Sequence, residues 1–300
     1  MPEGVSAASD TIYTRRAEYH DPANAFAFQW SRVPRRQFLD ERDRALDPAT
    51  RTAEILLDSS DALEIDYPAT TPTLLCRYLR LESGGAHVSR YAASGEIYYV
   101  MSGAGESRNG GDRIAWTAGD IFCFPGGGET NHTAGDADAL LFVVTNEPLL
   151  SFERLRPPEK AVIETVHYPA AEIARHLEAV FARERGAQEA GRAILFSSPA
   201  LGGCTNMLPS INVAINTLEP GGDQRPHRHN GVAVTLAIQG EGVYSMIEDQ
   251  RVDWSTNAAM ITPPAELHAH HNRGKARMVS LVIQDEALHY YTRTPGFSWD

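Results

Sequence analysis

The chain has 300 residues, of which 42% are hydrophobic and 22% charged, enough for one large globular domain or two of ordinary size. Its formal net charge of −12 argues against nucleic-acid or anionic-membrane partners, because phosphate binding requires clustered Lys and Arg. The three cysteines, Cys76, Cys123 and Cys204, are widely spaced and odd in number, which predicts neither a disulfide framework nor a CxxC metal site.

Residues 1–66 mix charged residues with scattered aromatics, and we interpret them as an N-terminal extension that packs on a core or on a partner subunit. Within them, Arg35–Ala45 is typical of a short surface helix, because Pro34 lies near its start and Pro48 beyond its end. Residues 1–16 show no secretory signal, and no run of about 20 apolar residues occurs that could span a membrane. We therefore expect a cytoplasmic protein.

Short β-type runs separated by glycine begin at residue 67 and continue to residue 150, and they return over residues 201–300. Strands at this spacing predict antiparallel sandwiches or barrels. Residues 151–200, between the two β blocks, contain apolar residues at helical spacing, namely Ile173, Leu177, Val180 and Phe181. The sequence therefore predicts an all-β protein with a minor helical part: an extension, a first barrel, a helical linker and a second barrel.

The two β blocks look like copies of one another. Leu81–Gly85 (LESGG) lies 137 residues before Leu218–Gly222 (LEPGG). The same offset of 137 relates Gly103–Gly105 (GAG) to Gly240–Gly242 (GEG). Two unrelated signals at one offset indicate an internal duplication.

A candidate metal site follows the second of these glycine turns. His227 and His229 are two residues apart, so in a strand both imidazoles project from one face, with about 7 Å of backbone between them. The later stretch Thr262–Asn272 offers a third ligand among His268, His270 and His271. Imidazole binds Fe, Zn, Cu and Ni, and three protein ligands with open positions are typical of a catalytic metal site.

These two stretches resemble the two motifs of the cupin superfamily, which are small antiparallel barrels of jelly-roll type. The first motif, a glycine, then HxH after five residues and a later glycine, is matched by Gly221, His227, His229 and Gly240. The second, PxG followed by His and Asn, is matched by Pro263, His268 and Asn272. Ala265 replaces the glycine of PxG, and Asn257 replaces a further glycine with which this second motif usually begins. The resemblance implies a bicupin, a chain with two cupin jelly-roll barrels.

The sequence of the second block most resembles that of ring-cleaving dioxygenases that act on gentisate, salicylate and 1-hydroxy-2-naphthoate. The resemblance implies Fe(II) held by His227, His229 and His268, with Mn, Ni or Zn as alternatives, and an aromatic substrate that reacts with O2. It implies that His270 is a nearby hydrogen-bonding or acid/base group and that Asn216 lies where the family often has a substrate-facing glutamine. A homo-oligomer, dimer or tetramer, is also expected.

The chain departs from this family at three places. The cupin glutamate is missing, since Ala233 and Val234 occupy its position. Three neutral imidazoles then leave a divalent metal its full charge, which favours an anionic, chelating substrate. Thr235 replaces the arginine that binds the substrate carboxylate, so we expect weak activity on gentisate unless Arg225 or Arg228 supplies the charge. The family's metal usually lies in the N-terminal cupin, whereas the intact motif here is C-terminal.

The first barrel is predicted to be metal-free and structural. The offset of 137 residues places Arg90 and Ala92 at the positions of His227 and His229. It places Thr130 or Asn131 at the position of the third ligand, His268. A remnant site formed by His87, Glu96 and His132 is the alternative for this barrel.

Three functions remain open for the whole chain. The first is an oxidoreductase, an extradiol-type Fe(II) dioxygenase of aromatic compound catabolism. The second is a non-oxygenase metal cupin, such as an isomerase, decarboxylase or lyase, in which the metal acts as a Lewis acid. The third is a non-catalytic cupin that binds a small molecule.

Overall fold

The computed structural model describes residues 10–21, 30–184 and 191–299. The chain divides into two compact units, residues 1–31 and residues 32–300. In the described part of the first unit, the regular element is a short 3-10 helix, η1 (Thr14–Arg16), and the side chains of Tyr13 and Tyr19 are exposed. Over the described residues, no helix has the length and apolar character needed to cross a membrane.

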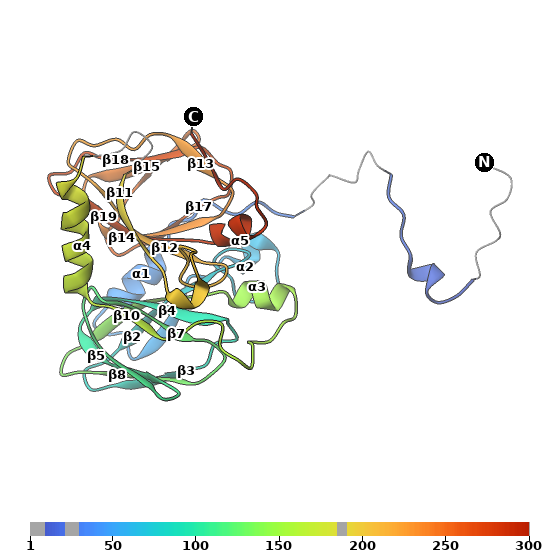
Figure 1. The fold of residues 1–300 in the computed structure, drawn as a ribbon, viewed down its shortest axis with the longest axis horizontal. Coiled ribbons are helices and arrows are strands. Elements are labelled where there is room, and N and C mark those ends of the chain that lie inside the picture. Colours follow the sequence, from blue (N-terminus) through green and yellow to red (C-terminus); the bar gives the residue numbers. More distant parts are fainter. Residues whose placement is uncertain (1–9, 22–29, 185–190, 300) are drawn as a thin grey trace. The chain divides into compact units, whose positions relative to one another are not determined.

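The second unit contains two antiparallel barrels, each built from two sheets (Figure 1). In the first barrel we call β1-β2-β9-β4-β7-β10 the back sheet and β3-β8-β5-β6 the front sheet. The strands are β1 (Ala53–Leu56), β2 (Leu75–Leu81), β3 (Ala86–Ser89), β4 (Gly95–Ser102), β5 (Ala104–Asn109), β6 (Asp112–Thr117), β7 (Ile121–Pro125), β8 (Thr130–Ala134), β9 (Ala139–Thr145) and β10 (Val166–Tyr168).

The second barrel repeats this plan. Its back sheet is β11-β12-β19-β14-β17 and its front sheet is β16-β15-β18-β13-β20. The strands are β11 (Arg192–Phe196), β12 (Asn212–Leu218), β13 (His227–His229), β14 (Ala233–Gln239), β15 (Val243–Ile247), β16 (Gln250–Asp253), β17 (Ala259–Thr262), β18 (His268–Asn272), β19 (Met278–Gln284) and β20 (Phe297–Trp299). The prediction of an all-β protein with two cupin-type barrels is confirmed.

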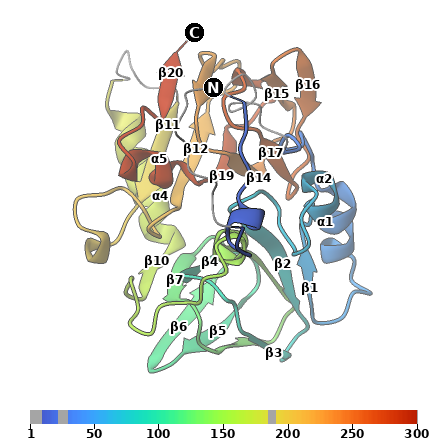
Figure 2. The same ribbon diagram turned by 90° about the vertical axis from the view of Figure 1, so that its right-hand side faces the viewer.

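Helices lie at the margins of the barrels (Figure 2). The longest, α4 (Ala170–Ala182), falls in the segment predicted to be helical, and Arg192 of β11 donates hydrogen bonds to the carbonyls of Val180 and Phe181 near its end. The others are α1 (Leu39–Leu46), α2 (Ser60–Leu63), η3 (Pro199–Leu201) and two short helices that follow the last long strand of each barrel, α3 (Glu147–Phe152) and α5 (Glu286–Tyr291).

The helix predicted over Arg35–Ala45 begins only at Leu39, because the residues before it are extended along β17. The amide of Phe38 donates to the carbonyl of Ala259, and the amide of Ile261 donates to the carbonyl of Arg36. Phe38 is fully buried, so this segment is anchored both by backbone hydrogen bonds and by an apolar side chain.

The faces of the two back sheets share one hydrophobic core. Alternate residues of the strands project to opposite faces, and most of those on the outer face of each back sheet are apolar. Tyr78 and Phe142 of the first barrel belong to the same buried cluster as Val234, Leu281 and Ile283 of the second. The two barrels therefore fold against each other.

The interiors of the barrels differ in content. The first is filled by a large apolar cluster that includes Tyr98, Trp116, Phe122 and Phe124. The corresponding cluster of the second barrel is smaller, and its members are Leu218, Ala237, Val243, Trp254, Met260 and Met278. Histidines occupy part of the second interior, and this is the barrel that carries the candidate site.

Candidate metal centre

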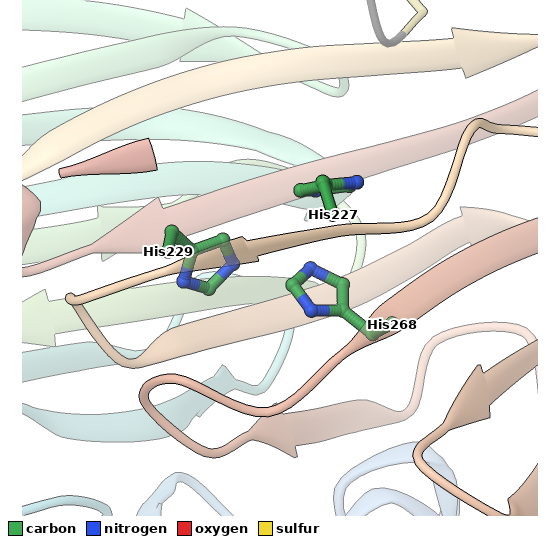
Figure 3. Close-up of side chains that lie close together, drawn as sticks. All are labelled: His227, His229 and His268. Atoms are coloured by element: carbon green, nitrogen blue, oxygen red, sulfur yellow. The ribbon is translucent and has the colours of Figure 1, made fainter. Parts of the chain in front are cut away.

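Three histidines meet inside the second barrel (Figure 3). His227 and His229 lie on β13, where alternation puts both on the inner face, and His268 on β18 is the cross-strand partner of His227. One nitrogen from each ring lies within 4.8 Å of the others. The residues are 5%, 3% and 4% exposed, respectively. Of the His, Cys, Asp and Glu residues that the structure describes, only these three form a group that could hold a metal ion.

Each imidazole is oriented by a backbone carbonyl. Nδ1 lies 3.0 Å from the carbonyl of Arg225 in His227, 2.7 Å from that of Gly231 in His229, and 2.9 Å from that of Glu266 in His268. A carbonyl can only accept, so each Nδ1 carries the proton and donates it. The lone pair is then on Nε2 in all three rings, which is the tautomer needed to bind a metal.

Burial keeps these rings neutral. Desolvation lowers the pKa of His227 and lowers the pKa of His229 to about 4. Burial, together with repulsion from the neighbouring rings, lowers the pKa of His268 to about 2. The donor set, three neutral imidazole nitrogens on one face, therefore fits a divalent transition metal with coordination positions left over.

Near the site, no carboxylate of the described residues joins the three imidazoles. Ala233, the first residue of β14, is 3% exposed and stands where the cupin glutamate would be. In the first barrel the equivalent residue is Glu96, because each lies four residues before a bulge that β4 and β14 have in common. The candidate metal site is consequently formed by uncharged side chains.

The two residues predicted to act beside the metal are on the inner face of the barrel. His270 lies on β18 with its ring centroid 6.1 Å from that of His268, and burial lowers its pKa to about 3. Its Nδ1 is 2.9 Å from the hydroxyl of Ser245. Asn216 is half-buried on β12, opposite Ser280 of β19.

The two arginines considered as carboxylate partners lie in different places. Arg228 projects from the other face of β13, where it pairs with Glu248 and donates to the carbonyl of Ala265. Arg225 is exposed, and its guanidinium lies 4.7 Å from the centre of the Trp299 ring. Thr235, at the family's arginine position, is 1% exposed.

The C-terminal strand β20 was not found from the sequence. It extends the front sheet beyond β13, with Trp299 opposite His227 and Phe297 opposite His229. The Phe297 ring stacks on the His227 ring, with centroids 4.9 Å apart and planes at 23°. The signal that could have revealed it is the alternation of two aromatics in residues 297–299.

The positions of the missing ligands in the first barrel need a correction of one residue. Ser89 pairs with Thr130 as His227 pairs with His268, so Ser89 and Tyr91 replace the two histidines of HxH. Arg90, which the offset of 137 selected along with Ala92, projects outward and is exposed. The loop before β13 is one residue longer than the loop before β3, and a shift of one residue reverses the face of every side chain.

The alternative remnant site does not assemble in the described residues. The His87 ring bonds Glu54 at 2.9 Å, and Glu96 accepts hydrogen bonds from Tyr98 and Thr130. His132 bonds Ser107 at 2.7 Å. His87 is thus held by Glu54, whereas Glu96 and His132 both lie within hydrogen-bond distance of the Tyr98 hydroxyl.

Comparison with known proteins agrees with this geometry. The family model for the cupin domain matches residues 214–284. A 5-aminosalicylate 1,2-dioxygenase from Comamonas sp. is 37% identical over 81 residues, 27% of this chain and 22% of that protein. A 1-hydroxy-2-naphthoate 1,2-dioxygenase from Nocardioides sp. (strain KP7) is 22% identical over 272 residues, 79% of this chain and 69% of that protein. The match to the first of these relatives thus spans about a fifth of its length.

The fold is that of solved bicupins. Salicylate 1,2-dioxygenase from Pseudoaminobacter salicylatoxidans, solved as adducts with gentisate, superposes with a TM-score of 0.73 at 12% identity, covering 90% of this chain and 86% of that one. A variant of oxalate decarboxylase from Bacillus subtilis has a TM-score of 0.55 at 13% identity, covering 90% and 78%. The chain thus has the two-barrel fold of these solved structures, its residues 214–284 match the cupin domain, and the sequence of its second barrel is similar to that of ring-cleaving dioxygenases.

Proposed function

We propose that this protein is an Fe(II)-dependent, extradiol-type dioxygenase that cleaves the ring of a hydroxylated aromatic compound. The observation that carries the proposal is the set of three neutral imidazoles, His227, His229 and His268, with no carboxylate of the described residues beside them. Such a site leaves the ion its full positive charge, so it favours an anionic substrate that chelates through a phenolate and a neighbouring donor. The relatives that share this barrel's sequence are named for ring substrates of this kind.

Iron would supply the electronic chemistry that the spin-restricted reaction of O2 with an aromatic ring requires. Both atoms of O2 end in the ring-opened product, so the reaction needs no external reductant. The remaining work belongs to the protein: orienting the ring, excluding water and handling the substrate proton.

His270 is proposed to hydrogen-bond the substrate hydroxyl or the oxygen that reacts with it. Its Nδ1 is engaged by Ser245, which leaves Nε2 for the ligand. A neutral imidazole in this position can donate or accept a hydrogen bond through Nε2. Asn216, on the inner face of β12, is proposed to contact the substrate through its amide.

The first barrel is proposed to bind no metal and to support the second. Ser89, Tyr91 and Thr130 stand at its ligand positions, and none is a good ligand for a transition metal. We propose that the protein acts as a homo-oligomer in the cytoplasm, where Cys76, Cys123 and Cys204 would stay reduced. Light scattering on the purified protein would give the oligomeric state.

The test is O2 consumption with a panel of hydroxylated aromatics after anaerobic loading with Fe(II), with metal analysis of the protein as isolated. We expect O2 uptake in proportion to product, with a shift of the substrate absorbance. Equal turnover without O2 would favour a Lewis-acid cupin, and binding without turnover would favour a non-catalytic one.

A further inference from the structure

The first barrel serves as an internal reference for the second. β4 bulges after Val100 and β14 bulges after Ala237, in each case where the strand pairs with the last long strand of its barrel. Tyr98 and Thr235 each lie two residues before the bulge, so they occupy the same place on the inner wall. The wall of the second barrel can therefore be compared with the filled wall of the first, position by position.

Two more inner positions follow from the same registers. Leu141 lies opposite Val100, the last residue before the bulge of β4, and Ser280 lies opposite Ala237 of β14. Phe124 pairs with Glu96, which lies four residues before the bulge of β4, and Thr262 pairs with Ala233, which lies four residues before the bulge of β14. In all three places a large apolar or aromatic residue of the first barrel is replaced by a small hydroxyl residue.

The large residues close the first interior. Tyr98 stacks on Phe122 with ring centroids 4.7 Å apart, and Phe124 packs edge-on against Phe122 at 5.6 Å. Leu141 belongs to the same buried cluster. The hydroxyl residues of the second barrel remove this side-chain volume while the strand pairing that frames it is retained.

The hydroxyl residues of this wall are deeply buried, and one of them lacks a partner. Ser280 is fully buried, and within the described residues its Oγ has no hydrogen-bond partner. Thr235 and Thr262 are each 1% exposed. A buried hydroxyl without a partner is destabilising, so native proteins rarely keep one unless another molecule satisfies it.

This wall also lacks a positive charge. In the first barrel Arg77 points into the interior from β2, where it pairs with Glu147. Arg77 lies opposite Val143, and Ala214 lies opposite Val282 in the matching registers of the second barrel. The inner wall beside the histidines thus has an alanine where the first barrel has an arginine, and hydroxyl residues where it has Tyr98, Phe124 and Leu141.

We propose that Thr235, Thr262 and Ser280 form the substrate wall of the second barrel, which takes a hydroxylated ring whose substituents on that side are uncharged hydrogen-bonding groups. The substrate class rests on the proposed function. The ion would bind the phenolate end of the ring, and the hydroxyl wall would bind groups such as an amide or a further hydroxyl. A carboxylate directed at this wall would be desolvated without a cation to pair with it, which disfavours it.

The first experiment needs no ligand. In a Cys204→Ser background, Ser280→Cys is expected to react with methyl methanethiosulfonate, because a ligand space admits a small reagent. Leu141→Cys, the equivalent position of the filled barrel, is the matched control and is expected to stay unmodified, as are Cys76 and Cys123, which are buried. Mass spectrometry of the intact protein gives the result. Equal protection of the two introduced thiols would overturn the proposal that the second interior is open.

The second experiment tests the substrate class. Binding of catechol, 3,4-dihydroxybenzamide and 3,4-dihydroxybenzoate to the Fe(II)-loaded protein is measured anaerobically by calorimetry. We expect the amide to bind at least about tenfold more tightly than the carboxylate. Thr235→Val and Ser280→Ala should weaken amide binding about five- to tenfold, the factor for one neutral hydrogen bond, and change catechol binding by less than about twofold.

Ser59→Ala is the matched control for Ser280→Ala. Ser59 is 2% exposed and its hydroxyl also lacks a partner within the described residues, but it lies before α2, outside the metal-binding barrel. Ser59→Ala should leave the affinities for catechol, 3,4-dihydroxybenzamide and 3,4-dihydroxybenzoate unchanged. Tight binding of 3,4-dihydroxybenzoate would contradict the proposed substrate wall while leaving the dioxygenase proposal intact. Unchanged binding of 3,4-dihydroxybenzamide in both Thr235→Val and Ser280→Ala would do the same. If the wild-type protein binds no ring, the proposed function and the substrate class fall together, and thiol labelling still decides whether the interior is open.

Discussion

Ser245 Oγ lies 2.9 Å from Nδ1 of His270 inside the second barrel, and it also accepts a hydrogen bond of 2.8 Å from the indole of Trp254. The first barrel contains the same arrangement. There Ser107 lies 2.7 Å from Nδ1 of His132 and accepts a 2.8 Å hydrogen bond from Trp116. The triple is therefore a framework feature of both barrels, and in the second it adjoins the three histidines that could hold a metal ion.

Replacing this serine should separate a structural effect from a catalytic one. Ser245→Ala and Ser107→Ala each leave a buried indole N–H without an acceptor, so each should lower the free energy of unfolding by about 1–3 kcal/mol in denaturant titrations. Only Ser245→Ala should also lower kcat, because it frees the ring of His270 to turn. Equal kcat in the two variants would mean that the triple serves stability alone, and Ser245→Thr should restore activity if the hydroxyl is what matters.

Loss of a ligand should remove the metal. His227→Ala or His268→Ala leaves two imidazoles, and we expect metal affinity to fall by more than about 100-fold, since even the loss of an outer partner costs 10–100-fold. Elemental analysis after gel filtration measures the effect. His271→Ala is the control, because His271 bonds Asp223 and stacks on Tyr244 on the outer face. Full occupancy in either ligand variant would refute the assignment.

His270→Ala should behave differently from the ligand variants. His270 is not one of the three rings that converge, so metal content should stay near that of the wild type. If the residue moves a proton, kcat should fall by about 10²- to 10⁴-fold. Steady-state O2 uptake, normalised to bound iron, measures this. An unchanged kcat would exclude His270 from the reaction.

The stability of the first barrel should depend on pH through Glu96. Burial raises the pKa of this carboxyl to about 7, against the hydrogen bonds from Tyr98 and Thr130 that oppose the shift. Between pH 4.5 and 7 the folded protein then holds a proton that the unfolded chain releases. The free energy of unfolding must therefore fall as pH rises through this interval, by about 3 kcal/mol in total for this group.

Glu96→Gln isolates that contribution, because glutamine keeps the shape and the acceptor oxygen but cannot ionise. Denaturant unfolding at about pH 5 and about pH 8, on either side of the folded pKa, should show a larger loss of stability in the wild type than in the variant. The same slope in both proteins would place the titration elsewhere, for example at Glu286, whose pKa burial also raises to about 7.

The convergence of His227, His229 and His268 could be predicted from the sequence because two simple periodicities determine it. His227 and His229 share a face through the alternation of a strand, and His268 faces His227 because β13 and β18 are antiparallel neighbours. The duplication was also visible, but one fixed offset cannot describe loops of unequal length. It therefore missed Ser89 and Tyr91 by one residue.

What the sequence could not predict depends on contacts between distant segments. The bond of Phe38 to Ala259 joins residues far apart in the chain, and it turned the first part of a predicted helix into an extended segment. The pairing of Trp299 with His227 is equally non-local. His270 meets Ser245 because β15 and β18 are neighbours in the folded sheet, a pairing that the sequence does not indicate.

The hydrophobic core between the two back sheets explains why a barrel without ligand residues would be retained. Val234, Leu236 and Leu281 of the metal-binding barrel are covered by the other barrel's side chains. If the C-terminal half were expressed alone, this sheet would face water over an apolar area that favours aggregation. The outer face of the first barrel's back sheet therefore supports the second barrel whatever its own interior holds.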